Sequence, residues 1–348
     1  MKTFIPDYNN LLQSARNIET ARTPLYEHII SYEIMEKVLG REFAALISGN
    51  KSDVNEFFHN YCEFFKTMGY DTVMYEEIIT DIMPGHGSLY GHKEGEIQCR
   101  ADFERYPWDE IPELYFSQNA IRFDALREHI PEGMMAVGGA GNGIFECVQD
   151  IVGYQNLCYI AVDDPELYRD IFRAAGDAAY RIWERLLREY SDMFCVYRFG
   201  DDLGFKSTTL LNADDVRTHI IPQYGRIIEM VHSLQKPFIF HSCGCIFNIM
   251  DDLIDAGINV KHSNEDQIAP FSEWVLKYGD RMGNFGGIDT DAVCRLDRQE
   301  MREYVADIFK LCRGHGGIAL GSGNSIPDYV PVEKYINMVE IIREMRKE

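Results

Sequence analysis

The chain has no long apolar run and no excess of basic residues. No stretch of about 18 apolar residues occurs, and the N-terminal MKTFIPDYNN lacks the apolar core of a signal peptide, so we expect neither a membrane span nor a secretion signal. Its 34 Lys and Arg against 56 Asp and Glu give a net charge of −22, which argues against nucleic acids and anionic membranes as partners. The nine cysteines form no regular framework, and this odd number favours a reduced, cytoplasmic setting.

No internal repeat, low-complexity tract or linker rich in Pro and Ser divides the chain. We therefore predict one domain over residues 23–348, preceded by a helical extension over residues 1–22. Apolar or β-rich runs that end near Gly, Asp or His predict eight strands. They are Thr23–His28, Tyr70–Tyr75, Met134–Val137, Phe194–Phe199, Pro237–Phe240, Ile258–His262, Arg281–Phe285 and Gly317–Leu320.

Helical patterns separate these runs. The clearest extends from Pro165 to Tyr190 with an apolar stripe on one side and Asp164 as its N-cap. Eight strands that alternate with helices in a chain of this length predict an α/β fold, a single TIM-type (β/α)8 barrel. The segment from Gly85 to Arg127 is rich in charge and aromatics, and we expect it to be an insertion near the barrel mouth.

The segment PFIFHSCGC, residues 237–245, ends a predicted strand in two soft metal ligands. Strand residues two apart point to the same side, so His241 and Cys243 face one site, and this N and S pair suits Zn²⁺. Glu265 lies 22 residues after Cys243, just past the next predicted strand, and is our candidate for a third ligand. The alternatives are a hydrogen-bonded His, a buried Cys that packs as a small apolar residue, and a surface Glu.

Barrel chemistry takes place where strands end, and polar side chains follow most of the predicted strands. Besides the candidate ligands they are Glu27, His28, Glu76, Glu77, Asn142, Asp201, Asp202, His262, Asp289 and Asn324. We predict that Asp202 and Asn324 contact substrate or orient a ligand rather than bind metal, and that Asp202 or Asp289 would carry proton chemistry in a metal-free enzyme. The simpler alternative for Asp and Asn after a strand is a helix N-cap.

Three further predictions concern residues near the mouth. Tyr75, with Phe145, Phe199 and Phe205, would line an apolar substrate site, unless these aromatics only pack. Asp201 is expected to pair with Arg198. The clusters GGAGNG and GSGNS lack the spacing and the Lys of a phosphate-binding loop, so we expect tight turns there.

Several motifs together resemble the uroporphyrinogen decarboxylase superfamily, and more closely its zinc methyltransferase branch. They are TPLYEHIIS, GYDTVMYEE, NGIFECVQDIVGYQNL, RFGDDLGF, HSCG, YGDRMGNFGGIDT and GSGNSIPDYVPVEKY, spread over nearly the whole chain. The branch includes methylcobamide:coenzyme M methyltransferases and the methyl-transfer enzymes of anaerobic O-demethylation. A similar zinc arrangement occurs in cobalamin-independent methionine synthase, and His241, Cys243 and Glu265 match its first three ligands in order and approximate spacing.

The chain departs from these patterns at two places. Asn324 stands where the methyltransferases usually have a Cys, which would leave zinc with three protein ligands and an open position, as in catalytic sites. Glu27 and His28 stand where the resemblance implies that a true uroporphyrinogen decarboxylase has an Arg motif. Tetrapyrrole decarboxylation is therefore the less favoured interpretation.

The resemblance implies a methyltransferase that moves a methyl group between a small donor or acceptor, an aryl methyl ether or a thiol, and a corrinoid (cobalamin) carried by a partner protein. The sequence leaves the direction of transfer open, as it does the choice between a monomer and a homodimer. Two other hypotheses remain at this point. One is a decarboxylase-like lyase without metal, and the other is a non-catalytic barrel that binds a small molecule.

Overall fold

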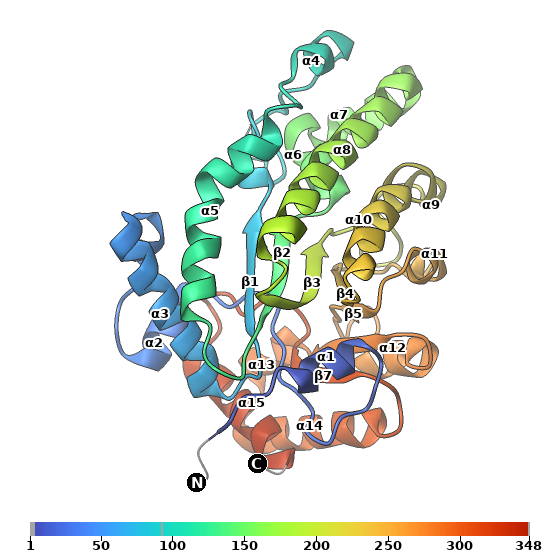
Figure 1. Cartoon of the computed structure of the whole chain (residues 1–348). Coiled ribbons are helices and arrows are strands. Elements are labelled where there is room, and N and C mark those ends of the chain that lie inside the picture. The colour runs from blue at the N-terminus through green and yellow to red at the C-terminus, as the bar shows by residue number, and fades with distance from the viewer. Residues whose placement is uncertain (1–3, 92, 347–348) are drawn as a thin grey trace.

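The computed structural model describes residues 4–91 and 93–346 and contains a parallel sheet of seven strands that follow one another in chain order (Figure 1). The strands are β1 Val73–Ile78, β2 Ala136–Gly141, β3 Phe194–Gly200, β4 Phe238–His241, β5 Val260–His262, β6 Gly283–Ile288 and β7 Ile318–Ser322. The sheet is curled into a half-barrel. The predicted α/β class is thus confirmed.

Helices connect the strands and cover the outside of the sheet (Figure 1). The α-helices are α1 Asn9–Ala15, α2 Tyr32–Leu39, α3 Lys51–Met68, α4 Arg100–Arg105, α5 Ile111–His129, α6 Ile144–Val152, α7 Tyr154–Asp163, α8 Pro165–Tyr190, α9 Ala213–Asp215, α10 Ile221–Ser233, α11 Met250–Asp255, α12 Phe271–Tyr278, α13 Thr290–Arg295, α14 Arg298–Cys312 and α15 Val332–Met345. Short 3-10 helices span Ala44–Ser48 and Thr80–Ile82, and a π-helical turn spans Val216–Ile220. In the part of the chain that is described, no helix has both the length and the apolar character needed to cross a membrane.

The first of the eight predicted strands, Thr23–His28, is not formed as a strand. Its only pairing there is an isolated parallel bridge between Leu25 and Leu320 of β7. Tyr26 N–H donates to Leu320 O, and Leu320 N–H donates to Pro24 O, both at 2.9 Å. Pro24 has no N–H of its own, so this segment covers the edge of β7 without extending a ladder.

The glycine cluster GGAG lies within β2 and not in the tight turn that we expected. Gly138 has φ +148°, and a Cβ there would overlap the backbone oxygen of Tyr75 on β1. Gly139 has φ +143°, and a Cβ there would stand 2.6 Å from the ring of Trp183 on α8. These glycines let β1 and the long helix α8 approach the strand closely. The GSGNS cluster likewise begins inside β7.

The segment expected as an insertion contains two different parts. The loop and α4 lie beyond the carboxyl end of β1 (Figure 1), as an insertion at the mouth would. Helix α5, in contrast, packs against α3 and α8 and is the helix that connects β1 to β2. The insertion is therefore shorter than the sequence suggested.

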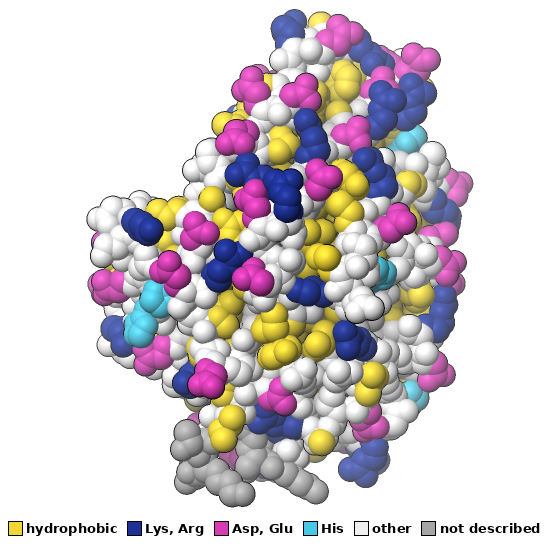
Figure 2. Space-filling model, in the orientation of Figure 1, with side chains coloured by type: hydrophobic (Ala, Val, Ile, Leu, Met, Phe, Trp, Pro, Cys, Tyr) yellow, Lys and Arg dark blue, Asp and Glu magenta, His cyan; other side chains and the backbone are white. Residues whose placement is uncertain are grey.

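The long helix α8 forms where the sequence predicted it. The Asp164 side chain accepts from Leu167 N–H at 2.9 Å, and Pro165 occupies the first helical position. The buried face of the helix carries apolar residues that pack on the sheet. On the surface, acidic side chains are interspersed with basic ones over the face that Figure 2 shows, so the net negative charge is not confined to one patch of that face.

Candidate metal centre at the strand ends

The carboxyl ends of the parallel strands bring residues distant in sequence to one edge of the sheet. His241 is the last residue of β4, and Cys243 follows in the next loop. Asp202 follows β3, which pairs with β4 through Gly200 and His241. Because parallel strands end on the same side, these three side chains meet at the mouth of the half-barrel.

His241, Cys243 and Asp202 place their ligand atoms within 4.8 Å of one another. His241 Nε2 lies 3.5 Å from Cys243 Sγ and 3.8 Å from Asp202 Oδ1. Tetrahedral zinc, with Zn–N of about 2.0–2.1 Å and Zn–S of about 2.3 Å, holds its N and S ligands roughly 3.5 Å apart. The donor set and the spacing of the pair therefore fit Zn²⁺.

The Cys243 sulfur is surrounded by donors. Asn324 Nδ2 donates to Sγ at 3.3 Å and the Ser263 hydroxyl at 3.8 Å. Asp202 Oδ1 accepts from the Cys243 backbone N–H at 2.9 Å. Burial, and then the nearby Asp202 carboxylate, raise the pKa of the Cys243 thiol. The metal-free thiol is consequently protonated at neutral pH, and a bound divalent cation would reverse this.

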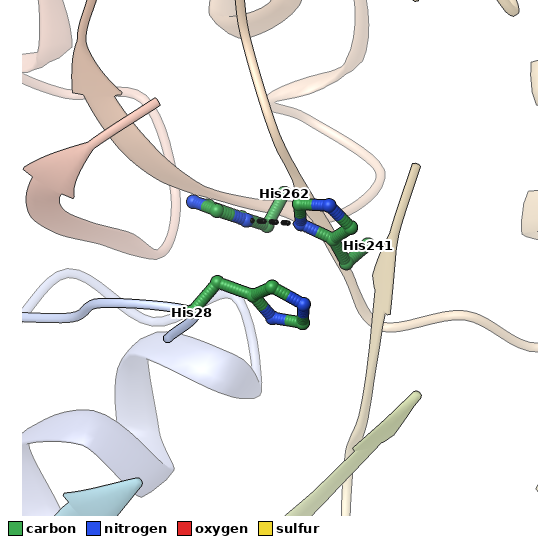
Figure 3. Close-up of side chains that lie close together, drawn as sticks. All are labelled: His28, His241 and His262. Carbon is green, nitrogen blue, oxygen red and sulfur yellow. Dashed lines mark hydrogen bonds between the residues drawn. The ribbon is translucent and has the colours of Figure 1, made fainter. Parts of the chain in front are cut away.

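A second group of nitrogen ligands consists of His28, His241 and His262, all buried (Figure 3). The rings of His28 and His241 are stacked, with centroids 3.8 Å apart and an angle of 4° between their planes. Ring nitrogens bind metals in the plane of the ring, and two parallel planes this far apart do not converge on one ion at about 2 Å. As placed, the three imidazoles therefore do not form one metal site.

Glu265, the predicted third ligand, is exposed and stands outside both groups. It lines a neighbouring cavity of about 560 Å³ that also includes Asn264, Asp289 and Asn324. Asp289 is the N-cap of α13, since one of its oxygens accepts from Asp291 N–H at 2.8 Å. The structure thus brings Asp202 and Asn324 to the candidate ligands His241 and Cys243, but it places Asp289 in the capping role.

Tyr75 is buried, and its hydroxyl donates to Glu77. With His28, Tyr32 and Arg198 it lines a second cavity of about 310 Å³. That Tyr75 lines a substrate site therefore stays a prediction. The three phenylalanines do not share this cavity. Phe145 and Phe199 are buried in the core and Phe205 is 59% exposed, which favours the packing alternative for the first two.

The predicted pair of Asp201 and Arg198 is wrong. Arg198 Nε donates to Glu76 at 2.8 Å inside the half-barrel. Asp201 accepts from the backbone N–H groups of Phe145 and Glu146, both at 2.8 Å, and from the Tyr224 hydroxyl. Burial raises the pKa of Asp201 to about 7.

Sequence reasoning missed two titratable groups at this edge. Burial raises the pKa of Glu146, and the carboxylates of Asp201 and Asp202 raise it further. Lys261, in the middle of β5, is 2% exposed, and its Nζ lies 3.7 Å from the Trp274 ring centroid. Burial lowers the pKa of Lys261 to about 7. A lysine inside an apolar run was the available signal for the second group.

Comparisons with known proteins agree with this architecture. The model of the uroporphyrinogen decarboxylase (URO-D) family matches residues 92–345. A methyltransferase from Methanosarcina mazei has a similar structure, with TM-score 0.71 and 15% identity over 97% of this chain and 98% of that one. A putative vitamin-B12 independent methionine synthase from Listeria monocytogenes is similar with TM-score 0.55 and 11% identity over 95% and 99% of the two chains.

A B12-independent methionine synthase from Shewanella sp. W3-18-1 is also similar, with TM-score 0.51 and 13% identity over 84% of this chain and 87% of that one. Among curated proteins, no match to the sequence was found. At these levels of identity, the similar structures establish a shared fold.

Proposed function

Since the chain belongs to the uroporphyrinogen decarboxylase family, we propose that it is a zinc-dependent methyltransferase that exchanges a methyl group between a small molecule and a corrinoid protein. The observation that carries this proposal is the 3.5 Å separation of His241 Nε2 and Cys243 Sγ, with Asp202 beside them. The family name alone would favour decarboxylation. An N and S ligand pair at the mouth supports the methyl-transfer branch, and the methyltransferase fold of the M. mazei protein is in line with it.

His241 and Cys243 are the proposed zinc ligands, and a carboxylate is the proposed third. Asp202 is the better placed of the two candidates, while Glu265 remains the competing prediction from sequence. Zinc bound there would act as a Lewis acid on the heteroatom that gains or loses the methyl group. Asn324 stands at the place of the expected fourth ligand and donates to Cys243 Sγ, so its role would be to orient the sulfur while one position stays open.

The cavity beside Tyr75 and His28 is proposed to hold the small molecule. Two of its lining side chains, Arg198 and Glu76, form an ion pair at 2.8 Å. The rings of Tyr32, Tyr61 and Tyr75 also line it, which suits an aromatic or apolar methyl donor. A corrinoid held by a partner protein would approach the same mouth from outside. We further propose that residues 23–348 form the single catalytic unit and that residues 1–22 are an extension to it.

Methyl transfer balances in both directions. From an aryl methyl ether, the methyl group moves to the reduced corrinoid, and the oxygen keeps the electron pair of the broken bond as a phenolate. In the other direction a thiol loses its proton to solvent, its sulfur takes the methyl group from the methylated corrinoid, and the corrinoid keeps the electron pair of the broken Co–C bond and returns to its reduced form. The direction stays open in this proposal.

A metal-free lyase is the second candidate. The observation that favours it is the carboxyl cluster of Asp201, Asp202 and Glu146, because a carboxyl with a pKa raised to about 7 can exchange protons near neutral pH. It is weaker than the first candidate because Asp201 is fully engaged by backbone N–H groups and Tyr224.

Metal content and the corrinoid absorption spectrum test the two candidates together. Freshly purified protein should contain about one zinc per chain. It should change the spectrum of cob(I)alamin with methyl donors, or of methylcobalamin with thiols. Cys243→Ala should lose both properties, and Cys245→Ala, a cysteine two residues away and outside the ligand group, should keep them. Decarboxylation of uroporphyrinogen by zinc-free protein, without methyl transfer, would favour the lyase.

A further inference from the structure

A chain of hydrogen bonds leads from the backbone of β7 to the candidate ligand His241. His262 Nε2 lies 3.0 Å from the backbone oxygen of Ser322, and His262 Nδ1 lies 2.7 Å from His241 Nδ1 (Figure 3). The two histidines end the paired strands β4 and β5. His262 is 0% and His241 5% exposed, so water does not compete for these bonds.

The direction of each hydrogen bond follows from the atoms involved. A backbone oxygen can only accept, so His262 must carry its proton on Nε2. His262 is 0% exposed, and burial favours the neutral form of the ring, which carries one proton and leaves Nδ1 bare. A bare Nδ1 can only accept, so His241 must donate from its own Nδ1.

This arrangement leaves a free lone pair on His241. His241 is 5% exposed, and a neutral imidazole carries a single proton, so its ring is protonated on Nδ1 and not on Nε2. Nε2 is the atom that faces Cys243 Sγ at 3.5 Å and Asp202 Oδ1 at 3.8 Å. The nitrogen presented to the candidate metal centre is thus the unprotonated one that a metal requires.

The surroundings hold His262 in this position. Gly286 has φ +103°, and a Cβ there would come within 3.0 Å of His262 Cδ2, so only glycine leaves room for the ring. The Tyr26 ring packs edge-on at 5.2 Å between centroids. Ser322 is itself fixed, because its N–H donates to Glu27 at 3.1 Å. The residue that supplies the acceptor at the start of the hydrogen-bond chain is therefore held by its own partner.

We propose that His262 is a positioning residue that locks His241 in the Nδ1–H tautomer and so presents Nε2 to the metal. Both nitrogens of His262 are engaged, so it is not a ligand itself. This inference rests on the proposed zinc site for its purpose, but the tautomer itself is a property of the metal-free chain. Such outer partners of a metal-binding histidine commonly change metal affinity 10- to 100-fold.

Two variants of His262 distinguish the effect of the hydrogen-bond acceptor for His241 from the effect of side-chain volume at this position. In His262→Asn, the amide oxygen can take the place of Nδ1 and still accept from His241. In His262→Leu no acceptor remains, although the volume is similar. Circular dichroism and thermal unfolding establish that each variant is folded before it is compared.

The first measurement is the tautomer of His241 in metal-free wild-type protein, from long-range ¹H–¹⁵N correlations of ¹⁵N-histidine-labelled chain. We expect Nδ1–H for His241 and Nε2–H for His262. The second is zinc affinity by competition with a chelator of known affinity. We expect His262→Leu to bind zinc about 10- to 100-fold more weakly than wild type, and His262→Asn to recover most of the difference.

An Nε2–H tautomer of His241 in the wild type would overturn the proposal, even if neither variant folds. Equal zinc affinity of wild type and a folded His262→Leu would overturn it as well. The proposed function fails differently. If the tautomers are as expected but the wild type binds no zinc, the positioning by His262 stands and the zinc methyltransferase does not.

Discussion

Removing one carboxylate at a time tests which of two residues is the third ligand of the proposed zinc site. Asp202 Oδ1 lies 3.8 Å from His241 Nε2, close to the roughly 3.4 Å between N and O ligands of tetrahedral zinc. Glu265 is exposed and outside the ligand group. We therefore expect Asp202→Asn to weaken zinc binding and Glu265→Gln to leave it nearly unchanged. The two changes remove the same charge, so each is the control for the other.

The size of the effect follows from the energetics of zinc sites. Four-ligand structural sites bind zinc with about 10–16 kcal/mol, or roughly 3 kcal/mol for each ligand. At 1.4 kcal/mol for each factor of ten, loss of Asp202 as a ligand should weaken binding by about 100-fold or more. Asn keeps an oxygen that can accept from Cys243 N–H, now bonded to Asp202 at 2.9 Å. The loop that carries Cys243 should therefore stay in place.

Competition with a chromogenic chelator at fixed pH measures both affinities, and metal analysis after dialysis checks the stoichiometry. A change within threefold for Glu265→Gln is expected, because it removes only an exposed charge outside the ligand group. The reverse result, a large loss of zinc affinity in Glu265→Gln and none in Asp202→Asn, would refute the choice of Asp202. It would favour the ligand set predicted from the sequence, which is His241, Cys243 and Glu265. Unchanged binding in both variants would refute a carboxylate ligand altogether.

Three further predictions concern protonation. Since burial raises the pKa of the Cys243 thiol, zinc must displace the thiol proton when it binds. The apparent zinc affinity should therefore rise about tenfold per pH unit between about pH 6 and 8. A zinc affinity that does not change with pH in chelator competition would contradict this. Burial raises the pKa of Glu27 to about 8, so its contribution to stability is complete below the unfolded value of 4.5 and is lost as pH rises through about 8, by at most about 5 kcal/mol. Urea unfolding of Glu27→Gln should show a flatter dependence on pH over this range, and an identical dependence would argue against a protonated Glu27. Burial lowers the pKa of Lys261 to about 7, so between about pH 7 and 10.5 the unfolded chain binds this proton more tightly than the folded chain does. Lys261→Met should therefore raise the unfolding free energy by a few kcal/mol at pH 7 and by almost nothing above pH 10.5. A lower urea midpoint of this variant at pH 7 would show that the contact of Lys261 with Trp274 outweighs the cost of burying the charge.

The sequence was a good guide to the fold because buried parallel strands are apolar runs. Seven of the eight predicted runs overlap a strand of the sheet. The predicted strands end too early where polar residues or glycines continue the strand in the structure. For example, β1 continues through Glu76 and Glu77. The prediction of a strand at Thr23–His28 was wrong because an apolar pattern indicates that a segment is buried, but not that it pairs with a neighbouring strand. In the structure, only Leu25 of this segment forms a bridge.

The candidate site was predictable only where it depends on local spacing. A spacing of two predicted that His241 and Cys243 face the same way, as strand residues two apart do, and their side chains do meet. Cys243 itself lies in the loop after β4, where its N–H donates to Asp202 at 2.9 Å. The contact between Asn324 and Cys243 spans 81 residues and depends on how the half-barrel curls. Glu265 was predicted from its place after β5, but a loop residue can turn outward, and it lies exposed. Partners such as Glu76 for Arg198 are set by three-dimensional packing and have no signal in the spacing.

The neighbouring residues Asp201 and Asp202, which follow β3, point to different parts of the mouth. Asp201 is fully buried and turns toward the start of α6, where it accepts from Phe145 and Glu146 N–H groups. Asp202, the next residue, turns toward the loop after β4 and accepts from Cys243 N–H. The first carboxylate fixes β3 against α6, and this anchor determines where the second can reach. A change at Asp201 is therefore expected to disturb the candidate metal centre through position alone, without removing a proposed ligand. For this reason the ligand assignment is tested at Asp202 and not at Asp201.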